Sequence, residues 1–137
     1  MLPKPVKDEH TRSISLSAET NVQVPMRDGT VLYADVYRPN GAGRWPVLLS
    51  RIPYGKHKPR YRAMYLDLTR AVARGYAVVI QDVRGRHASQ GVFEPYIHEP
   101  EDGFDTVEWC AAQPWSDGNV GMFGISYHGA TQWLAAA

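Results

Sequence analysis

The fold of this chain can be predicted from one run of residues, Asn119-Val-Gly-Met-Phe-Gly-Ile-Ser-Tyr-His-Gly129. Residues 120–123 form a short apolar segment typical of a strand, and the alanine-rich residues 130–137 favour a helix. Between them lies a tight, glycine-flanked turn that carries Ser126. A strand, such a turn and a helix together form a nucleophile elbow, which exposes the serine hydroxyl near a helix N-terminus that favours negative charge. The pattern predicts a serine hydrolase with Ser126 as its nucleophile.

The glycine spacing departs from the common G-x-S-x-G pattern. His128 stands two residues after Ser126, and the second glycine follows at position 129. Glycine at this turn relieves crowding between strand and helix, so the displacement needs an explanation. An ordinary strand–helix turn in which Ser126 caps the helix is the alternative interpretation. The pattern of the surrounding chain favours the nucleophile.

Composition places the chain among soluble globular proteins. Its 137 residues are 44% hydrophobic and 21% charged, and 15 basic against 14 acidic residues give a net charge of +1. No charged block suggests nucleic acid or a membrane surface as a partner, and no apolar run approaches the roughly 20 residues that span a bilayer. The N-terminus lacks an apolar signal core, so we expect a cytoplasmic protein. The oligomeric state is left open.

Hydrophobic periodicity divides the chain before the elbow. Residues 1–20 are polar and predict a loose arm or an edge segment, followed by a domain over residues 21–137. An Asp-Gly turn at Asp28 between two alternating runs predicts a β-hairpin. Buried strands are predicted at 46–51 and 76–80, with a helix over 61–74 between them.

A further helix is predicted to begin near Glu99 and to bury a stripe of Phe104, Val107 and Ala111. Negative charge at its start suits the helix dipole, which accounts for the acidic cluster of Glu99, Glu101, Asp102 and Asp105. We predict that Cys110 is an inert core residue of this helix.

Alternating strands and helices predict an α/β fold with parallel central strands and helices on both faces of the sheet. Reactive groups gather beyond the carboxyl ends of the strands in such sheets. Three loops fall at that edge: the loop at Tyr54, the loop after Asp82 and the elbow itself. Asp82 is expected to pair with Arg84 and Arg86 and so brace its loop.

Tyr54 is the second candidate for the site. A tetrahedral intermediate needs hydrogen-bond donors aimed at its oxyanion. The backbone N–H of Tyr127, which follows the nucleophile, supplies one donor in an elbow. The Tyr54 hydroxyl is a candidate for the second, with simple packing of the ring at a loop as the alternative.

The catalytic base and acid are not found in the sequence. In elbow hydrolases the acid and then the histidine follow the serine in the chain. The eleven residues after Ser126 contain no Asp or Glu and no histidine except His128. His128 shares the turn and is expected to point away from the serine hydroxyl, lining the site or lying on the helix surface. Metal-binding spacings such as H-E-x-x-H and C-x-x-C are missing, so we expect no metal and no cofactor.

Five blocks in order resemble the CocE/NonD hydrolases, a family that includes cocaine esterase, α-amino acid ester hydrolases and Xaa-Pro dipeptidyl-peptidases. The blocks are residues 24–39, Arg51-Ile-Pro-Tyr-Gly-Lys56, Gln81-Asp-Val-Arg-Gly-Arg-His-Ala-Ser-Gln-Gly91, residues 101–109 and residues 115–129. The resemblance implies an α/β-hydrolase fold with Ser126 as nucleophile. It also implies an oxyanion hole of the Tyr54 hydroxyl and the Tyr127 N–H. The family's elbow is similar to Gly-x-Ser-Tyr-x-Gly, so His128 occupies a variable position.

Length sets the chain apart from the family. Family members place the triad Asp and His well downstream, with a helical cap and a C-terminal domain. We therefore expect an N-terminal piece of the catalytic domain, inactive by itself, whose full-length form cleaves esters or amides. Xaa-Pro dipeptidyl-peptidase activity is the first alternative. A non-catalytic fragment or binding relic of the fold, with an exposed and aggregation-prone elbow strand, is the second.

Overall fold

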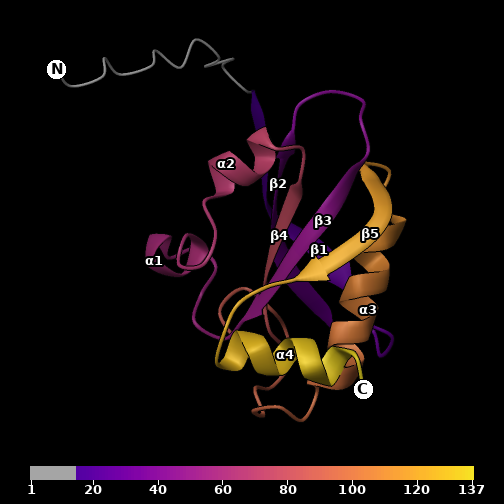
Figure 1. Ribbon diagram of the computed structural model, residues 1–137. Helices are drawn as coiled ribbons and strands as arrows, with labels where there is room; N and C mark the ends of the chain where they lie inside the picture. The colour runs from indigo at the N-terminus through magenta and orange to yellow at the C-terminus, as the bar shows by residue number, and fades with distance from the viewer. Residues whose placement is uncertain (1–14) are drawn as a thin grey trace, which may run out of the picture.

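The computed structural model describes residues 15–137 and contains a mixed five-stranded sheet (Figure 1). The strands lie in the order β1-β2-β4-β3-β5. Their bounds are β1 (Leu16–Pro25), β2 (Val31–Pro39), β3 (Trp45–Ile52), β4 (Ala77–Asp82) and β5 (Ser116–Met122). β3 runs parallel to both of its neighbours, whereas β2 is antiparallel to β1 and β4. The predicted parallel centre of the sheet is confirmed.

The predicted hairpin is formed by β1 and β2. Its turn is closed by a hydrogen bond from Met26 N to Thr30 O at 2.8 Å, and Gly29 takes a positive φ of 84° that glycine adopts at low cost. β1 already begins at Leu16 and forms one edge of the sheet, so the strand starts earlier than the predicted boundary at Asn21. The rest of the predicted arm, residues 1–14, lies outside the described residues.

The helix predicted over 61–74 is wrong in its middle. The structure has two short helices there, α1 (Pro59–Arg62) and α2 (Leu68–Ala73). Asp67 separates them because its backbone is extended and its side chain accepts a hydrogen bond from Arg70 N at 3.0 Å, capping α2. A capping aspartate starts a new helix more readily than it continues an old one.

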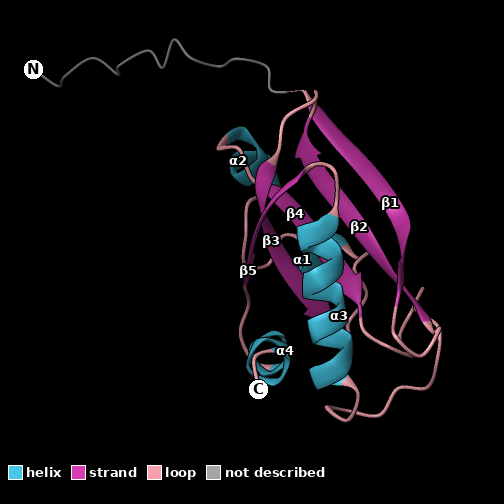
Figure 2. Cartoon of the chain, turned by 90° about the vertical axis from the view of Figure 1, so that its right-hand side faces the viewer, coloured by secondary structure: helices cyan, strands magenta, loops and turns pink. Residues whose placement is uncertain are grey.

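Two longer helices follow β4, namely α3 (Glu99–Ala112) and α4 (Tyr127–Ala135). α3 covers one face of the sheet, and α4 packs on α3 and β3 (Figure 2). Within residues 15–137, no helix combines the length and the apolar character needed to cross a membrane.

Side chains on opposite faces of the sheet feed two apolar cores. Leu49 and Val79 pack with Cys110 of α3, whereas Val78 and Ile80 pack with the residues of α2 on the other face. Neighbouring strand residues point to opposite faces, so both faces of these central strands are covered. The prediction of helices on both faces of the sheet is confirmed. Cys110 is buried as predicted, and its burial raises the pKa of the thiol to about 12.

The predicted apolar stripe of α3 is wrong at Phe104, whereas Val107 packs against the apolar core and Ala111 is half-buried. Phe104 is 51% exposed, and the residues that α3 buries are largely polar: Glu99, Asp102, Gly103, Thr106 and Cys110. The reason is that the sheet presents polar groups to them. Thr106 Oγ1, for example, donates to Gln81 Oε1 at 3.0 Å. Helical periodicity of apolar residues therefore misses the buried face by one position.

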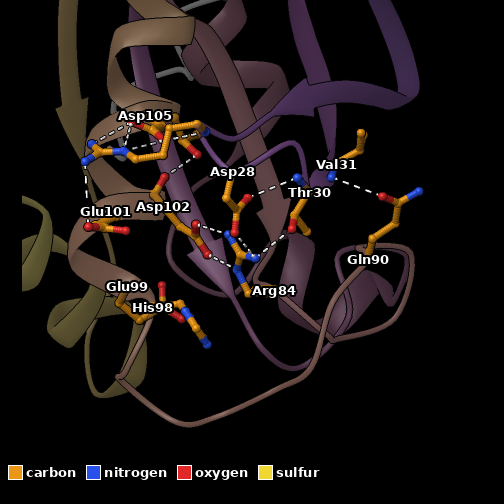
Figure 3. Close-up of polar contacts among 12 residues, drawn as sticks. Asp28, Thr30, Val31, Arg84, Gln90, His98, Glu99, Glu101, Asp102 and Asp105 are labelled. Atoms are coloured by element: carbon orange, nitrogen blue, oxygen red, sulfur yellow. Dashed lines mark hydrogen bonds and ion pairs between the residues drawn. The ribbon is translucent and has the colours of Figure 1, made fainter.

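Arg84 joins the hairpin turn to α3 (Figure 3). Its guanidinium donates two hydrogen bonds to Asp102, at 2.7 and 2.8 Å, and one each to Asp28 and Thr30, both at 2.8 Å. These carboxylates raise the pKa of Arg84 above its usual value. The sequence did not predict this pairing.

The ion pair predicted between Asp82 and the arginines of its loop is wrong. Asp82 instead accepts hydrogen bonds from the backbone N–H groups of Lys56, at 2.8 Å, and Ala88, at 3.2 Å. Arg86 Nε donates to Pro53 O at 2.9 Å. Asp82 and Arg86 therefore both connect the loop after β4 with the loop after β3.

Two glycines with similar backbone angles provide a test of this loop. Gly85 has a φ of +71°, and an added Cβ would overlap the backbone of Val92 and Phe93. Gly29 has a φ of +84° with nothing within 4 Å of its Cβ position. We predict that Gly29→Ala lowers the free energy of unfolding by about 1–2 kcal/mol through backbone strain. Gly85→Ala should cost about 3 kcal/mol or more, because overlap adds to strain. Urea unfolding of both variants measures the difference, and equal losses would contradict the described loop.

Candidate active site

Ser126 lies between β5 and α4 in a strained backbone conformation, with φ 57° and ψ −124°. A positive φ is uncommon for residues other than glycine, costs about 1–3 kcal/mol and is concentrated at functional sites. Ser126 is exposed, and its side chain makes no capping hydrogen bond to α4. The interpretation of Ser126 as a helix cap therefore finds no support in its contacts.

Gly124 explains why the turn needs glycine. Its φ is +119°, and a Cβ at this position would overlap Cβ of His128. The nearest atom to a Cβ on Gly129 is Gly124 O at 3.7 Å, which is ordinary contact. The elbow is therefore tightly packed at Gly124, before the serine, and not at Gly129.

The three loops predicted to converge do meet at one end of the sheet. Val83 N, after β4, donates to Ile52 O, at the end of β3, at 3.0 Å. The loop after β3 reaches the elbow through Tyr54, whose ring centroid lies 5.7 Å from that of His128. The loop after β4 reaches the elbow through Tyr96, whose ring stacks on Tyr127 at 4.7 Å. The convergence is confirmed.

Tyr54 is held beside the elbow by packing. The ring is half-buried and stacks on Tyr61 of α1 with centroids 5.1 Å apart. The packing that the alternative interpretation predicted is therefore present. It also fixes the ring against His128, two residues from Ser126.

Tyr127 turns its side chain into the protein. Its hydroxyl donates to Glu99 Oε1 at 3.1 Å and accepts from Tyr96 N at 3.2 Å. Burial is the main cause that raises the pKa of this phenol to about 12, so it is neutral at ordinary pH. The backbone N–H of Tyr127 belongs to the first turn of α4, where such groups have no partner within the helix.

His128 lies beneath the turn, not on the helix surface, which corrects that part of the prediction. It is 2% exposed, and Nδ1 lies 3.2 Å from Ile125 O. Donation to this carbonyl leaves Nε2 as an acceptor, and Nε2 is buried with no partner among the described residues. Burial lowers the pKa of His128. The imidazole therefore stays neutral and packs edge-on to Tyr65, 5.1 Å away.

Arg51 and Glu99 are the buried pair that the sequence did not identify. Arg51 is 0% exposed, and its Nη1 lies 2.5 Å from Glu99 Oε2, while Nε donates to Gln81 Oε1 at 2.6 Å. A charged residue at the end of an apolar strand is a signal of such pairing, because an unpaired buried charge is very costly. The acidic start of α3 serves this contact as well as the helix dipole.

The described residues were also compared with the requirements of a metal site and of an apolar ligand pocket. Across residues 15–137, no three His, Cys, Asp or Glu side chains are grouped to hold a metal ion. An apolar hollow of about 370 Å³ lies beside α2, away from the elbow, and is lined in part by Leu48, Leu66, Ala71 and Tyr76.

The fold and its exposed elbow serine define an α/β-hydrolase, and comparison with known proteins narrows the class. The chain belongs to the X-Pro dipeptidyl-peptidase (S15) family, whose sequence model matches residues 28–137. It is 50% identical over 121 residues to the cocaine esterase of Rhodococcus sp. (strain MB1 Bresler), covering 88% of this chain and 21% of the esterase.

Solved structures agree with this assignment. A CocE/NonD family hydrolase from Staphylococcus aureus superimposes with a TM-score of 0.81 at 36% identity, covering 88% of this chain and 25% of that one. An α-amino acid ester hydrolase gives a TM-score of 0.74 at 29% identity, covering 97% and 26%. The predicted kinship with the CocE/NonD hydrolases is confirmed. The chain spans a fifth to a quarter of the length of these relatives.

Burial of neutral His128 predicts a specific pH dependence of stability. Its folded pKa lies below the ordinary value of about 6.5, so the unfolded chain binds the proton first as pH falls. The contribution to the free energy of unfolding is complete above about pH 6.5 and is lost as pH falls toward the folded pKa. Urea unfolding between about pH 7.5 and 5 should show this slope, and His128→Leu should remove it.

The matched control is Thr131→Val. Thr131 is fully buried and donates to His128 O at 2.8 Å. Its loss should lower stability by about 1 kcal/mol at every pH and leave the slope unchanged. An identical slope in the wild type and in His128→Leu would contradict the burial of a neutral imidazole.

Proposed function

We propose that Ser126 is the nucleophile of a hydrolase that cleaves ester or amide bonds through an acyl-enzyme. The single observation that carries the proposal is the strained, exposed backbone of Ser126 at the β5–α4 junction. Strain at one non-glycine residue, with no capping bond in return, is typical of a residue kept in place for chemistry. Family membership and the esterase relatives support the same reaction class.

In the proposed reaction, Ser126 Oγ attacks the substrate carbonyl carbon and gives its proton to a histidine base. The resulting oxyanion accepts hydrogen bonds from the Tyr54 hydroxyl and the Tyr127 N–H. Collapse of the intermediate expels the alcohol or amine, which takes up the proton, and water then releases the acyl group. His128 is unsuited to the role of base, because it is buried under the turn with Nδ1 at a backbone carbonyl. The base and its orienting acid belong to the region that the longer relatives have in addition.

The comparisons support two candidate substrate classes. The 50% identity to a cocaine esterase favours esters, whereas the description of the matching family favours peptides with proline in the second position. The Tyr127 side chain is not placed to contact either kind of substrate, since it is buried against Glu99. Parallel assays of an aryl ester and an Xaa-Pro p-nitroanilide with the complete hydrolase decide which class has the larger kcat/KM.

Removal of the nucleophile gives the most direct test. In the complete hydrolase, Ser126→Ala should abolish labelling by a fluorophosphonate and lower kcat by about 10⁶-fold, because the acyl-enzyme cannot form. Ser17→Ala, in edge strand β1, is the matched control and should keep both properties. Labelling that persists in Ser126→Ala would refute the proposal. The 137-residue chain alone is expected to show no turnover above background.

The role of Tyr54 has a separate test. Tyr54→Phe removes a hydroxyl and keeps the ring that packs on Tyr61 and His128. We expect kcat to fall about 10²–10³-fold with little change in KM, because an oxyanion donor acts mainly in the transition state. Tyr61→Phe, which alters the stacked neighbour in the same way, should change kcat by less than about twofold. Comparable kinetics of Tyr54→Phe and wild type would limit Tyr54 to packing.

A further inference from the structure

Glu99 connects the two segments that carry the proposed oxyanion donors. Its Oε1 accepts the hydrogen bond from the Tyr127 hydroxyl, and its Oε2 pairs with Arg51 Nη1 at 2.5 Å. Tyr127 is the elbow residue with the candidate N–H donor, and Arg51 precedes the candidate donor Tyr54 by three residues at the end of β3. One buried carboxylate thus links both donor segments, and it is 3% exposed.

We propose that Glu99 is a positioning residue that sets the separation and orientation of the two oxyanion donors. This inference rests on the proposed function, because it presupposes a serine acyl hydrolase with Tyr54 and Tyr127 as donors. Oxyanion donors act at about 2.7–3.1 Å from the developing charge, and a misplacement of about 1 Å can cost about 10²-fold in rate. A rigid link between the donor segments therefore has direct catalytic value.

The surroundings of Glu99 make the link rigid. Tyr127 is fixed at three points: its hydroxyl holds Glu99, Tyr96 N donates to that hydroxyl, and its ring stacks on Tyr96 at an interplanar angle of 22°. Arg51 is held at its other end by Gln81 Oε1, which also accepts from Thr106. The N–H of Tyr127 moves with a residue whose side chain cannot rotate freely.

A second set of contacts holds the elbow without involving Glu99. Gln132 Nε2 donates to Gly124 O at 2.9 Å, and His128 packs under the turn. These contacts keep the serine turn closed without reaching the Tyr54 loop through a hydrogen bond. Loss of the Glu99 contact should therefore leave the elbow formed and loosen the donor geometry.

The test compares Tyr127→Phe, Glu99→Gln and Glu101→Gln in the complete hydrolase. Tyr127→Phe keeps the backbone N–H and the Arg51–Glu99 pair and removes both hydrogen bonds of the phenol, the one to Glu99 and the one from Tyr96 N. We expect kcat to fall about tenfold or more with KM nearly unchanged, and affinity for a boronic acid that mimics the tetrahedral intermediate to fall in parallel. Glu99→Gln, if it folds, should lose at least as much, because it also neutralises the partner of Arg51. Glu101, on the exposed side of α3, is the matched control and should give wild-type values.

A double-mutant cycle with Tyr54→Phe separates positioning from general stability. If Glu99 acts through the oxyanion hole, Tyr127→Phe should cost less than about threefold once Tyr54 has lost its hydroxyl. Unchanged kcat in Tyr127→Phe, or a loss of the same factor in both backgrounds, would overturn the proposal. Failure of the proposed function is distinguishable, because it appears as retained activity in Ser126→Ala.

Discussion

The buried contact between Arg51 and Glu99 is the interaction on which the carboxyl end of the sheet depends. Arg51 has no exposed surface, so its charge needs a partner at any arrangement of the chain that buries β3. Glu99 supplies it from the first turn of α3, 48 residues away. Replacement of a buried pair by apolar residues can leave stability unchanged, so stability alone does not account for it. The hydrogen bonds of Arg51 have fixed directions, so they orient the end of β3 relative to α3.

The same principle extends along α3. Asp102 pairs with Arg84, and Thr106 bonds to Gln81, so each turn of the buried face finds a polar partner below it. Farther along, Cys110 returns to the apolar core. Hydrogen bonds therefore fix the N-terminal half of α3 on the sheet, and apolar packing around Cys110 holds its C-terminal half. The turn that carries Ser126 is connected to this helix through the hydrogen bond from Tyr127 to Glu99.

Local patterns in the sequence predicted most of the fold. The Asp28-Gly29 turn, the buried strands and the elbow each follow from a short-range preference of the backbone or from period-2 burial. The prediction of one helix over 61–74 was wrong because Asp67 caps a second helix. The stripe of α3 was misplaced by one position because most of the residues that the helix buries are not apolar. At the site, Ser126, Tyr54 and Tyr127 were chosen from the sequence, and their chemical roles stay predictions. The Glu99 link was missed because its members are joined only through the tertiary fold.

The order of strands in the sheet has a consequence for how the chain folds. β4 lies between β2 and β3, and β5 pairs with β3 through contacts such as Trp45 with Ser116. The hairpin of β1 and β2 can form from neighbouring residues, but β3 acquires no partner until β4 has been made and inserted. Such long-range pairing is slow, and a chain synthesised from its N-terminus holds an unfinished sheet in the meantime. Among the described strands β5 comes last in the sequence, so the strained turn at Ser126 can be fixed only after β5 has paired with β3.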